Sequence, residues 1–410
     1  MRSHRATTTR LPRSPNAAGL IRLARALADS GSHIEDEFWS AQMAAELKRI
    51  LQQGSDAPIH AALEFLWDSD MGGEENTLRC RNSAYEALAA HIEAACESTV
   101  LEIDNRPHAV LLIACPVMAW SRAVIAAGRI RADTLQALQT QLQAHVLADG
   151  VKLTLVESLF SPDQMPEGYA SIYRLTKKAS QALASGSLSV SKPEDWPEAL
   201  PFLADSRFVV GAIAAPEGAP LFRWQTIGAT PQIKRSDCIE EWKTRGSVAL
   251  ANMLSNCAYE MVEPGAFFSS TRATEREIRS FSLKASVSFL HMSLDLAPPA
   301  QQAVVARCQD GEFEEYRIGF CKLGQTQVLH GAIWPLLGPE LDNPEEPNEI
   351  ETALRLAGIS SIIHIDTLLP AEFCSDCGVP LYPNPEGELL HAEVSAEAEN
   401  SESSVHQALH

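Results

Sequence analysis

The sequence predicts a mixed α/β (α+β) protein: an N-terminal helical domain, two duplicated α/β units with mixed sheets, and a C-terminal Cys-x-x-Cys-Gly knuckle. Three observations predict it. Apolar residues recur with helical spacing up to about residue 98, strand-like runs alternate with helical patterns after about residue 100, and two halves of the later part share residues at a constant spacing. The composition is 45% hydrophobic and 21% charged, which is typical of a globular chain with sizeable cores.

The first folded segment, residues 16–100, has a helical pattern throughout. Leu20, Leu23 and Leu27 recur at three- and four-residue steps, and a second pattern begins after the break Ser30-Gly31-Ser32. Further helices are expected near 57–68 and 82–97, giving three or four short antiparallel helices. The glycines in the loop 70–73 lack the Lys and Ser/Thr of a phosphate-binding loop, so this loop is interpreted as a plain turn.

From residue 101 the pattern predicts two α/β units. The first, residues 101–230, has a strand at 108–118, a helix at 132–148, a strand at 151–160, a helix at 166–186, and strands at 207–213 and 221–226. The second, residues 231–370, has a helix at 238–255, a strand at 257–267, a helix at 272–294, strands at 303–308, 316–321 and 326–334, a helix at 348–357 and a strand at 359–366.

Matching residues predict that these units are copies of one another. At an offset of 106 residues, Val156-Glu157 matches Val262-Glu263, and Lys178-Ala179-Ser180 matches Lys284-Ala285-Ser286. Two such halves usually pack about a pseudo-twofold axis, and the groove between them is then a candidate ligand site. The prediction fails if the two halves differ in strand order.

Charge and cysteine usage exclude several classes of function. The formal net charge of −20 disfavours nucleic acid or anionic lipid as the main partner. We expect no membrane span and no secretion signal, because no apolar run reaches about 18 residues. Nine cysteines in apolar segments indicate reduced thiols in a cytoplasmic protein.

The two ends of the chain carry opposite charge. Residues 1–15 are expected to form a disordered basic tail, the one place where contact with nucleic acid is considered. Residues 394–410 are expected to form a disordered acidic tail.

Residues 371–393 contain the one motif with metal-binding spacing. Two thiolates three positions apart, Cys374 and Cys377, can hold one metal ion from a tight turn, and Gly378 permits the backbone conformation that such a turn requires. A structural zinc ion with His391 as a further ligand is expected. His364, Cys321 or the same cysteines of a second subunit are alternative completions. Unligated thiols and a redox pair are the competing interpretations, but the prolines that follow Cys377 disfavour the helix that a redox pair needs.

The remaining polar residues give weaker signals. His364 and Asp366 share one face of a strand, Glu157 and Glu263 occupy matched positions, and three arginines lie beside strands: Arg122, Arg223 and Arg317. Ordinary structural or surface roles are favoured for all of them over catalysis or anion binding. Motifs for nucleophile elbows, zinc proteases and dinucleotide binding are missing, so no catalytic or cofactor-binding residue is assigned and enzyme activity stays open.

Several segments together resemble a known family: 30–36, 119–122, 218–225, 315–320 and 373–388. The chain is similar, over about residues 16–393, to the domain-of-unknown-function family 2863 of beta-proteobacteria. The resemblance implies a soluble bacterial protein and a knuckle that belongs to the family pattern, but it implies no activity, cofactor or catalytic residue.

Two functional hypotheses remain. The first is a non-catalytic binding or scaffold protein with a structural metal knuckle, whose partner is another protein or a second copy of the chain. The alternative is an enzyme or small-ligand sensor whose site lies in the groove between the α/β halves and is lined by Glu157, Glu263 or His364.

Overall fold

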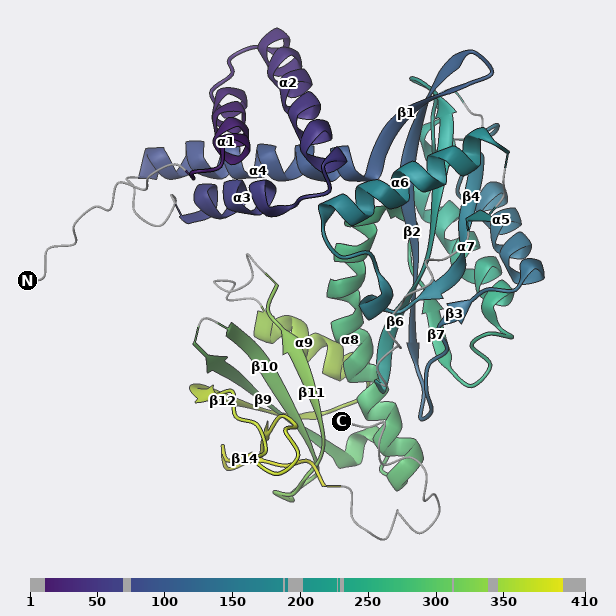
Figure 1. The fold of residues 1–410 in the computed structure, drawn as a ribbon. Helices are drawn as coiled ribbons and strands as arrows, with labels where there is room; N and C mark the ends of the chain where they lie inside the picture. Colours follow the sequence, from purple (N-terminus) through teal and green to yellow (C-terminus); the bar gives the residue numbers. More distant parts are fainter. Residues whose placement is uncertain are drawn as a thin grey trace, which may run out of the picture.

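The computed structural model describes residues 12–68, 75–186, 189–190, 202–226, 228, 232–311, 313–337 and 346–393. Within them it combines helices with mixed sheets, which confirms the predicted α+β class (Figure 1). Residues 1–11 of the expected basic tail, the whole expected acidic tail 394–410 and the loop 70–73 lie outside the described residues.

The N-terminal helices lie beside the first sheet and share one buried cluster with it (Figure 1). They begin at recognisable caps: the Ser14 hydroxyl accepts the N–H of Ala17 at 3.4 Å, and the Ser32 hydroxyl accepts the N–H of Glu35 at 3.3 Å. The Glu35 carboxylate in turn accepts the N–H of Gly31 at 3.2 Å. The predicted helices are therefore present, as α1 (Pro15–Ala28), α2 (His33–Gln52), α3 (Ala57–Asp68) and α4 (Glu75–Glu97).

A mixed sheet follows α4 and has helices on both faces. Alternate residues of its long central strand face opposite cores: Val110 and Leu112 pack with α6 and the N-terminal helices, whereas Ile113 packs with α5 and α7. Its main strand order is β1-β2-β6-β4-β3, and β7 and β8 also pair with β2. The elements are β1 (Ser98–Ile103), β2 (Arg106–Trp120), β3 (Gly128–Arg129), α5 (Ala132–His145), β4 (Lys152–Phe160), η2 (Pro162–Gln164), α6 (Tyr169–Ala184), β5 (Ser189–Val190), β6 (Ala204–Pro216), η3 (Arg223–Gln225), α7 (Arg235–Leu250), β7 (Ala258–Met261) and β8 (Gly265–Ala266).

Two local predictions for this part were wrong. The expected strand 221–226 contains the short 3-10 helix η3, because the Gln225 side chain accepts the backbone N–H groups of Leu221 and Phe222 and turns the chain. The expected strand 257–267 is split into β7 and β8, and Pro264 between them has no N–H group to continue a ladder.

A second, four-stranded sheet lies below the first in Figure 1 and has the order β11-β10-β9-β12. One of its faces packs against α8 and α9, and the C-terminal hairpin covers the other. The long helix α8 contacts both sheets and joins the two parts of the molecule. The elements are α8 (Phe267–Leu294), η4 (Pro298–Ala300), β9 (Gln301–Asp310), β10 (Phe313–Lys322), β11 (Val328–Pro335), α9 (Glu346–Leu356), β12 (Ser361–Pro370), β13 (Tyr382–Pro383) and β14 (Leu389–Leu390).

The predicted duplication is not confirmed, because the two sheets differ in strand order. In the first sheet β6 lies between β2 and β4 and is antiparallel to both, whereas β9, β10 and β11 form a simple meander with β12 parallel to β9. Within the matched triplets, Ala179 and Ala285 are both buried on helices, where small residues allow close packing. The expected boundary between the two α/β units at residue 230 does not coincide with the division between the two sheets, because β7 and β8 pair with β2 of the first sheet.

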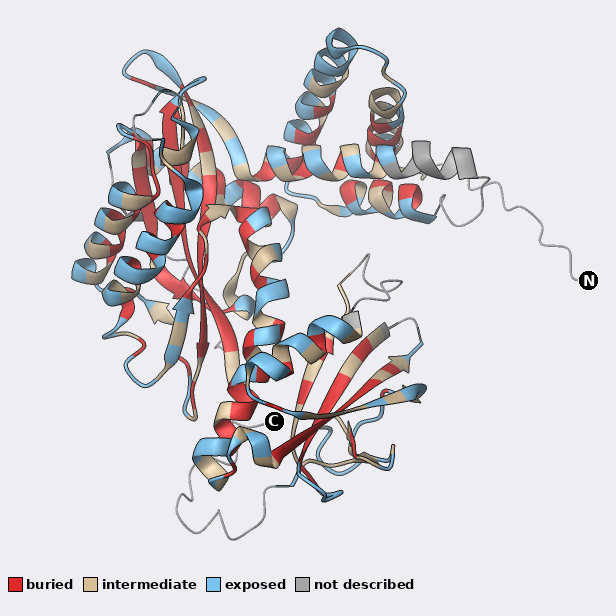
Figure 2. Cartoon of the chain, turned by 180° about the vertical axis from the view of Figure 1, so that it is seen from behind, coloured by how far each residue is buried: buried red, intermediate tan, exposed pale blue. Residues whose placement is uncertain are grey.

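The described residues fall into several buried clusters rather than one core (Figure 2). The strands β2, β4 and β6 of the first sheet are mostly buried, and red predominates at the centre of this sheet in Figure 2. The second sheet has its own core, formed with α8 and α9. The Cys-rich segment, residues 371–393, packs on the face of the second sheet that α8 and α9 do not cover.

Candidate metal centre

The Cys-rich loop is closed by its own backbone hydrogen bonds. The N–H of Cys374 donates to the Val379 carbonyl and the N–H of Gly378 to the Cys374 carbonyl, both at 2.8 Å. Gly378 has a φ of +75°, a conformation that glycine adopts without strain. The resulting tight turn brings the side chains of Cys374 and Cys377 together, as the spacing predicts.

A short hairpin then returns the chain to this loop. Strands β13 and β14 pair antiparallel, and the turn between them is organised by Asn384, which is 1% exposed. The Asn384 side-chain oxygen accepts the N–H groups of Glu386 and Glu388, each at 2.9 Å. Directly after β14, His391 reaches the knuckle, and its Nε2 lies 3.2 Å from the Cys377 Sγ.

Cys374, Cys377 and His391 therefore lie close enough to hold one metal ion. One ligand atom from each lies within 4.8 Å of the other two. Around a tetrahedral zinc ion, a sulfur and a nitrogen ligand are separated by about 3.5 Å, so this donor set fits zinc. Cys377 is exposed, and the other two side chains are half-buried.

The loop also favours the thiolate form that metal binding needs. Backbone hydrogen bonds from Asp376 and Cys377 lower the pKa of Cys374 below its usual value. The other cysteines show the opposite behaviour: burial raises the pKa of Cys115 to about 12 and that of Cys321 to about 11. Among the described cysteines with a resolved shift, the thiolate is favoured only at the knuckle.

The hairpin sits on the second sheet at a pair of glycines. Gly319 of β10 and Gly331 of β11 are cross-strand partners. A methyl group on Gly319 would overlap the Pro383 carbonyl oxygen, and one on Gly331 would overlap the Tyr382 ring. These glycines allow the close approach of β13 to the sheet, a contact that the sequence analysis missed because it joins residues far apart in the chain.

Arg317 of β10 binds the loop that carries Cys374 and Cys377. Its fully buried guanidinium donates through Nε to the Glu315 carboxylate at 2.7 Å. Nη1 donates to the carbonyl oxygens of Glu372 and Leu381, the two ends of the Cys-rich loop. The guanidinium also faces the Phe373 ring at 5.0 Å. Arg317, considered in the sequence analysis as an anion-binding side chain, therefore holds the loop through Nη1.

Cys321 and His364, the alternative metal ligands considered in the sequence analysis, lie outside the cluster. Cys321 is fully buried on β10, and the His364 imidazole pairs with Glu351 at 3.5 Å. Neither belongs to the donor cluster, which is the one group of three or more potential metal ligands within the part of the chain that the structure describes.

The residues expected to line a groove between the halves pair with different partners. Glu157 pairs with Arg129 at 3.7 Å, and Glu263 accepts a hydrogen bond from Arg235 at 2.6 Å. His364 on β12 pairs with a third residue, Glu351. Of the remaining candidates, Arg223 lies 3.7 Å from Asp149, Asp366 is exposed, and Arg122 is half-buried.

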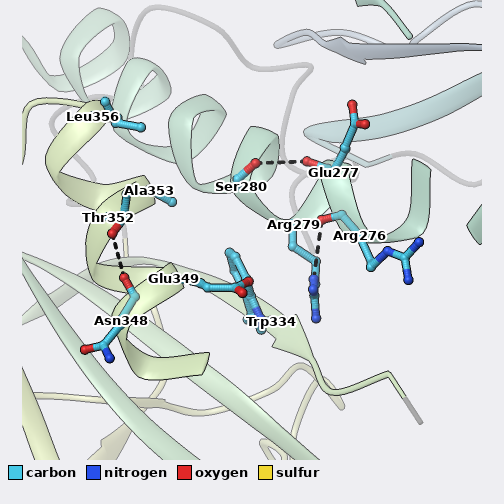
Figure 3. A pocket seen from close by; sticks show the side chains of 10 residues that line it. All are labelled: Arg276, Glu277, Arg279, Ser280, Trp334, Asn348, Glu349, Thr352, Ala353 and Leu356. Atoms are coloured by element: carbon cyan, nitrogen blue, oxygen red, sulfur yellow. Dashed lines mark hydrogen bonds between the residues drawn. The ribbon is translucent and has the colours of Figure 1, made fainter. Parts of the chain in front are cut away.

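A hollow of about 530 Å³ lies between α8, α9 and β11 (Figure 3). Trp334 lies at its base, covered by the Arg279 guanidinium at 4.6 Å, and Arg279 donates to the Pro335 carbonyl at 3.1 Å. Arg276 and Glu349 add opposite charges to the lining. Its basic and acidic side chains do not define one class of ligand.

Comparison with known proteins shows the family of the chain. Residues 4–405 match the family described as a protein of unknown function (DUF2863). The chain belongs to this family. Neither the curated proteins nor the solved structures gave a match. In the described residues no helix is both long and apolar enough to cross a membrane.

Proposed function

We propose that this member of the DUF2863 family is a zinc-binding protein in which the ion stabilises the C-terminal hairpin. The observation that carries the proposal is the convergence of Cys374, Cys377 and His391, whose ligand atoms lie within 4.8 Å of one another. Two thiolates and an imidazole are donors that zinc prefers. The metal would tie the end of β14 to the knuckle and so close the loop between residues 377 and 391.

A competition titration against a chromophoric zinc chelator tests this proposal. The wild-type chain should bind one zinc ion tightly, whereas Cys374→Ser, Cys377→Ser and His391→Ala should each weaken binding by about 100-fold or more. His364→Ala is the matched control, because this imidazole pairs with Glu351 outside the cluster. Equal zinc affinity in the control and in all three site variants would refute the proposal.

We further propose a binding or scaffold role towards another protein, carried by the N-terminal helices. Large apolar side chains are exposed there: Ile34 at 79% and Phe38 at 54% on α2, and Trp67 at 55% on α3. Apolar side chains that remain in water are common at protein-binding surfaces.

The test is co-purification at native expression level. A reproducible partner should be lost with Ile34→Glu/Phe38→Glu but kept with Val248→Glu, which alters an equally exposed apolar residue of α7. Retention of all partners by the α2 variant, or the absence of a reproducible partner from the wild type, would argue against this role.

A further inference from the structure

We infer that Cys374 and Cys377 form a peroxide-sensitive pair whose oxidation to a disulfide releases the metal ion. This inference rests on the zinc site proposed above and adds a regulatory step to it. Zinc binds thiolates, and the sulfur atoms of a disulfide carry no such charge, so one oxidation removes two ligands at once. The His391 imidazole alone binds zinc far more weakly than the three described donors together.

The turn places the two sulfur atoms where a disulfide can form. The hydrogen bond from the Gly378 N–H to the Cys374 carbonyl, at 2.8 Å, closes one tight turn over residues 374–378. Such a turn brings the Cα atoms of its first and fourth residues within about 7 Å, and disulfides span about 4.4–6.8 Å between Cα atoms. The two Sγ atoms lie within 4.8 Å of one another, and the Cys377 thiol donates a hydrogen bond to the Cys374 sulfur.

Exposure distinguishes this pair among the cysteines that the structure describes. Cys377 is exposed, and Cys374 is half-buried. Cys257 is half-buried outside the cluster, and the other five are buried: Cys96, Cys115, Cys238, Cys308 and Cys321. A peroxide in solution therefore reaches Cys377 first and finds a second sulfur beside it, because the oxidation of cysteine follows exposure and thiolate character.

The reaction consumes one hydrogen peroxide molecule and transfers two electrons. The Cys377 thiolate attacks one peroxide oxygen, so that a sulfur–oxygen bond forms, the oxygen–oxygen bond breaks and hydroxide leaves. The Cys374 thiolate then attacks the sulfur of this sulfenic acid, so that the disulfide bond forms, the sulfur–oxygen bond breaks and a second hydroxide leaves. Two thiolates are oxidised, the peroxide is reduced to two hydroxide ions, and Zn²⁺ passes to the solvent.

The contacts that hold the hairpin on the sheet involve neither sulfur. Arg317 binds the carbonyl oxygens of Glu372 and Leu381, and β13 lies over Gly319 and Gly331. These contacts remain when the ion leaves, so the change is local and the oxidised chain stays folded. A thiol reductant can therefore restore the site.

Peroxide treatment of the zinc-loaded full chain, after removal of excess reductant, tests the inference. A chromophoric indicator measures the released zinc, and mass spectrometry of proteolytic fragments locates the disulfide. We expect one zinc ion to be released for each Cys374–Cys377 disulfide formed, and zinc binding to return after dithiothreitol. Cys257→Ser is the matched control and should release zinc like the wild type, because this half-buried thiol lies outside the cluster.

Two outcomes would overturn the inference while leaving the proposed zinc site intact. One is zinc that stays bound in excess peroxide; the other is zinc released without a disulfide between Cys374 and Cys377, including a disulfide from either of them to another thiol. A reduced chain that binds no zinc before peroxide is added would instead refute the zinc site itself, and this inference with it.

Discussion

At the residue scale, the position of the knuckle depends on Arg317. The guanidinium is fully buried, and its charge is balanced by Glu315, which is also buried. One side chain thus joins β10 to both ends of a loop that lies more than fifty residues further along the chain. Arg317 can do this because its planar fork presents several donors in fixed directions.

Replacing Arg317 by Met should lower the free energy of unfolding by about 3–5 kcal/mol, because Glu315 then keeps a buried charge without a partner. Urea denaturation measures this loss. Arg317→Met/Glu315→Gln is the matched control and should recover part of the stability. If the double variant is as unstable as the single one, the buried ion pair is not the cause.

Tyr382 should make the stability of the protein depend on pH above about 10. Burial raises the pKa of this phenol from its ordinary value of 10 to about 12. The protonated phenol is favoured by folding, so its contribution is complete below pH 10 and is lost as the pH rises towards 12. Denaturation curves across this range should fall more steeply for the wild type than for Tyr382→Phe. Parallel curves would contradict this assignment.

At the element scale, the β13–β14 hairpin is held by shape as well as by hydrogen bonds. The cross-strand pair Gly319 and Gly331 removes two side chains from the face of the sheet on which β13 lies. A close approach of this kind tolerates no added methyl group at these positions.

Gly319→Ala should therefore destabilise the protein by about 1–3 kcal/mol and weaken zinc binding, because the hairpin that carries His391 is displaced. Thermal unfolding and the chelator competition measure both effects. Gly265→Ala is the control, since a methyl group there meets nothing closer than the Ser270 hydroxyl at 3.8 Å. If Gly319→Ala binds zinc with wild-type affinity, the close packing of the hairpin on the sheet does not position the site.

Most helices and strands could be predicted from local pattern, since buried runs such as 108–118 and helical repeats such as 132–148 need no knowledge of distant residues. The pairing of strands could not. Nothing near β7 indicates that it joins β2 of the first sheet. At the candidate site, the spacing of Cys374 and Cys377 and the choice of His391 came from the sequence. The roles of Arg317 and of the paired glycines did not, because they depend on contacts across the fold.

At the scale of the whole molecule, the separate buried clusters limit how far the stabilising effect of the metal extends. The N-terminal helices and the first sheet share one cluster, while the second sheet packs its own residues with α8 and α9. Among the described residues, β13 packs against β9, β10 and β11 of the second sheet, and Arg317 of β10 binds the loop directly. Loss of the metal should therefore affect that part of the chain alone.

Hydrogen exchange before and after chelation tests this separation. Removing the metal should speed amide exchange in residues 371–393 and along the facing strands β10 and β11, and leave α1–α4 and β2 unchanged. The Cys374→Ser/Cys377→Ser variant should show the same local pattern without chelator. Faster exchange throughout the N-terminal helices would indicate instead that the metal stabilises the whole fold.

The central claim is that Cys374, Cys377 and His391 hold a zinc ion, and the metal content of the purified full chain tests it most directly. Under reducing conditions without chelator, elemental analysis should find about one zinc per chain. The metal should be absent from Cys374→Ser/Cys377→Ser and retained in His364→Ala. A wild-type chain without zinc, or equal zinc in the double variant, would contradict the account.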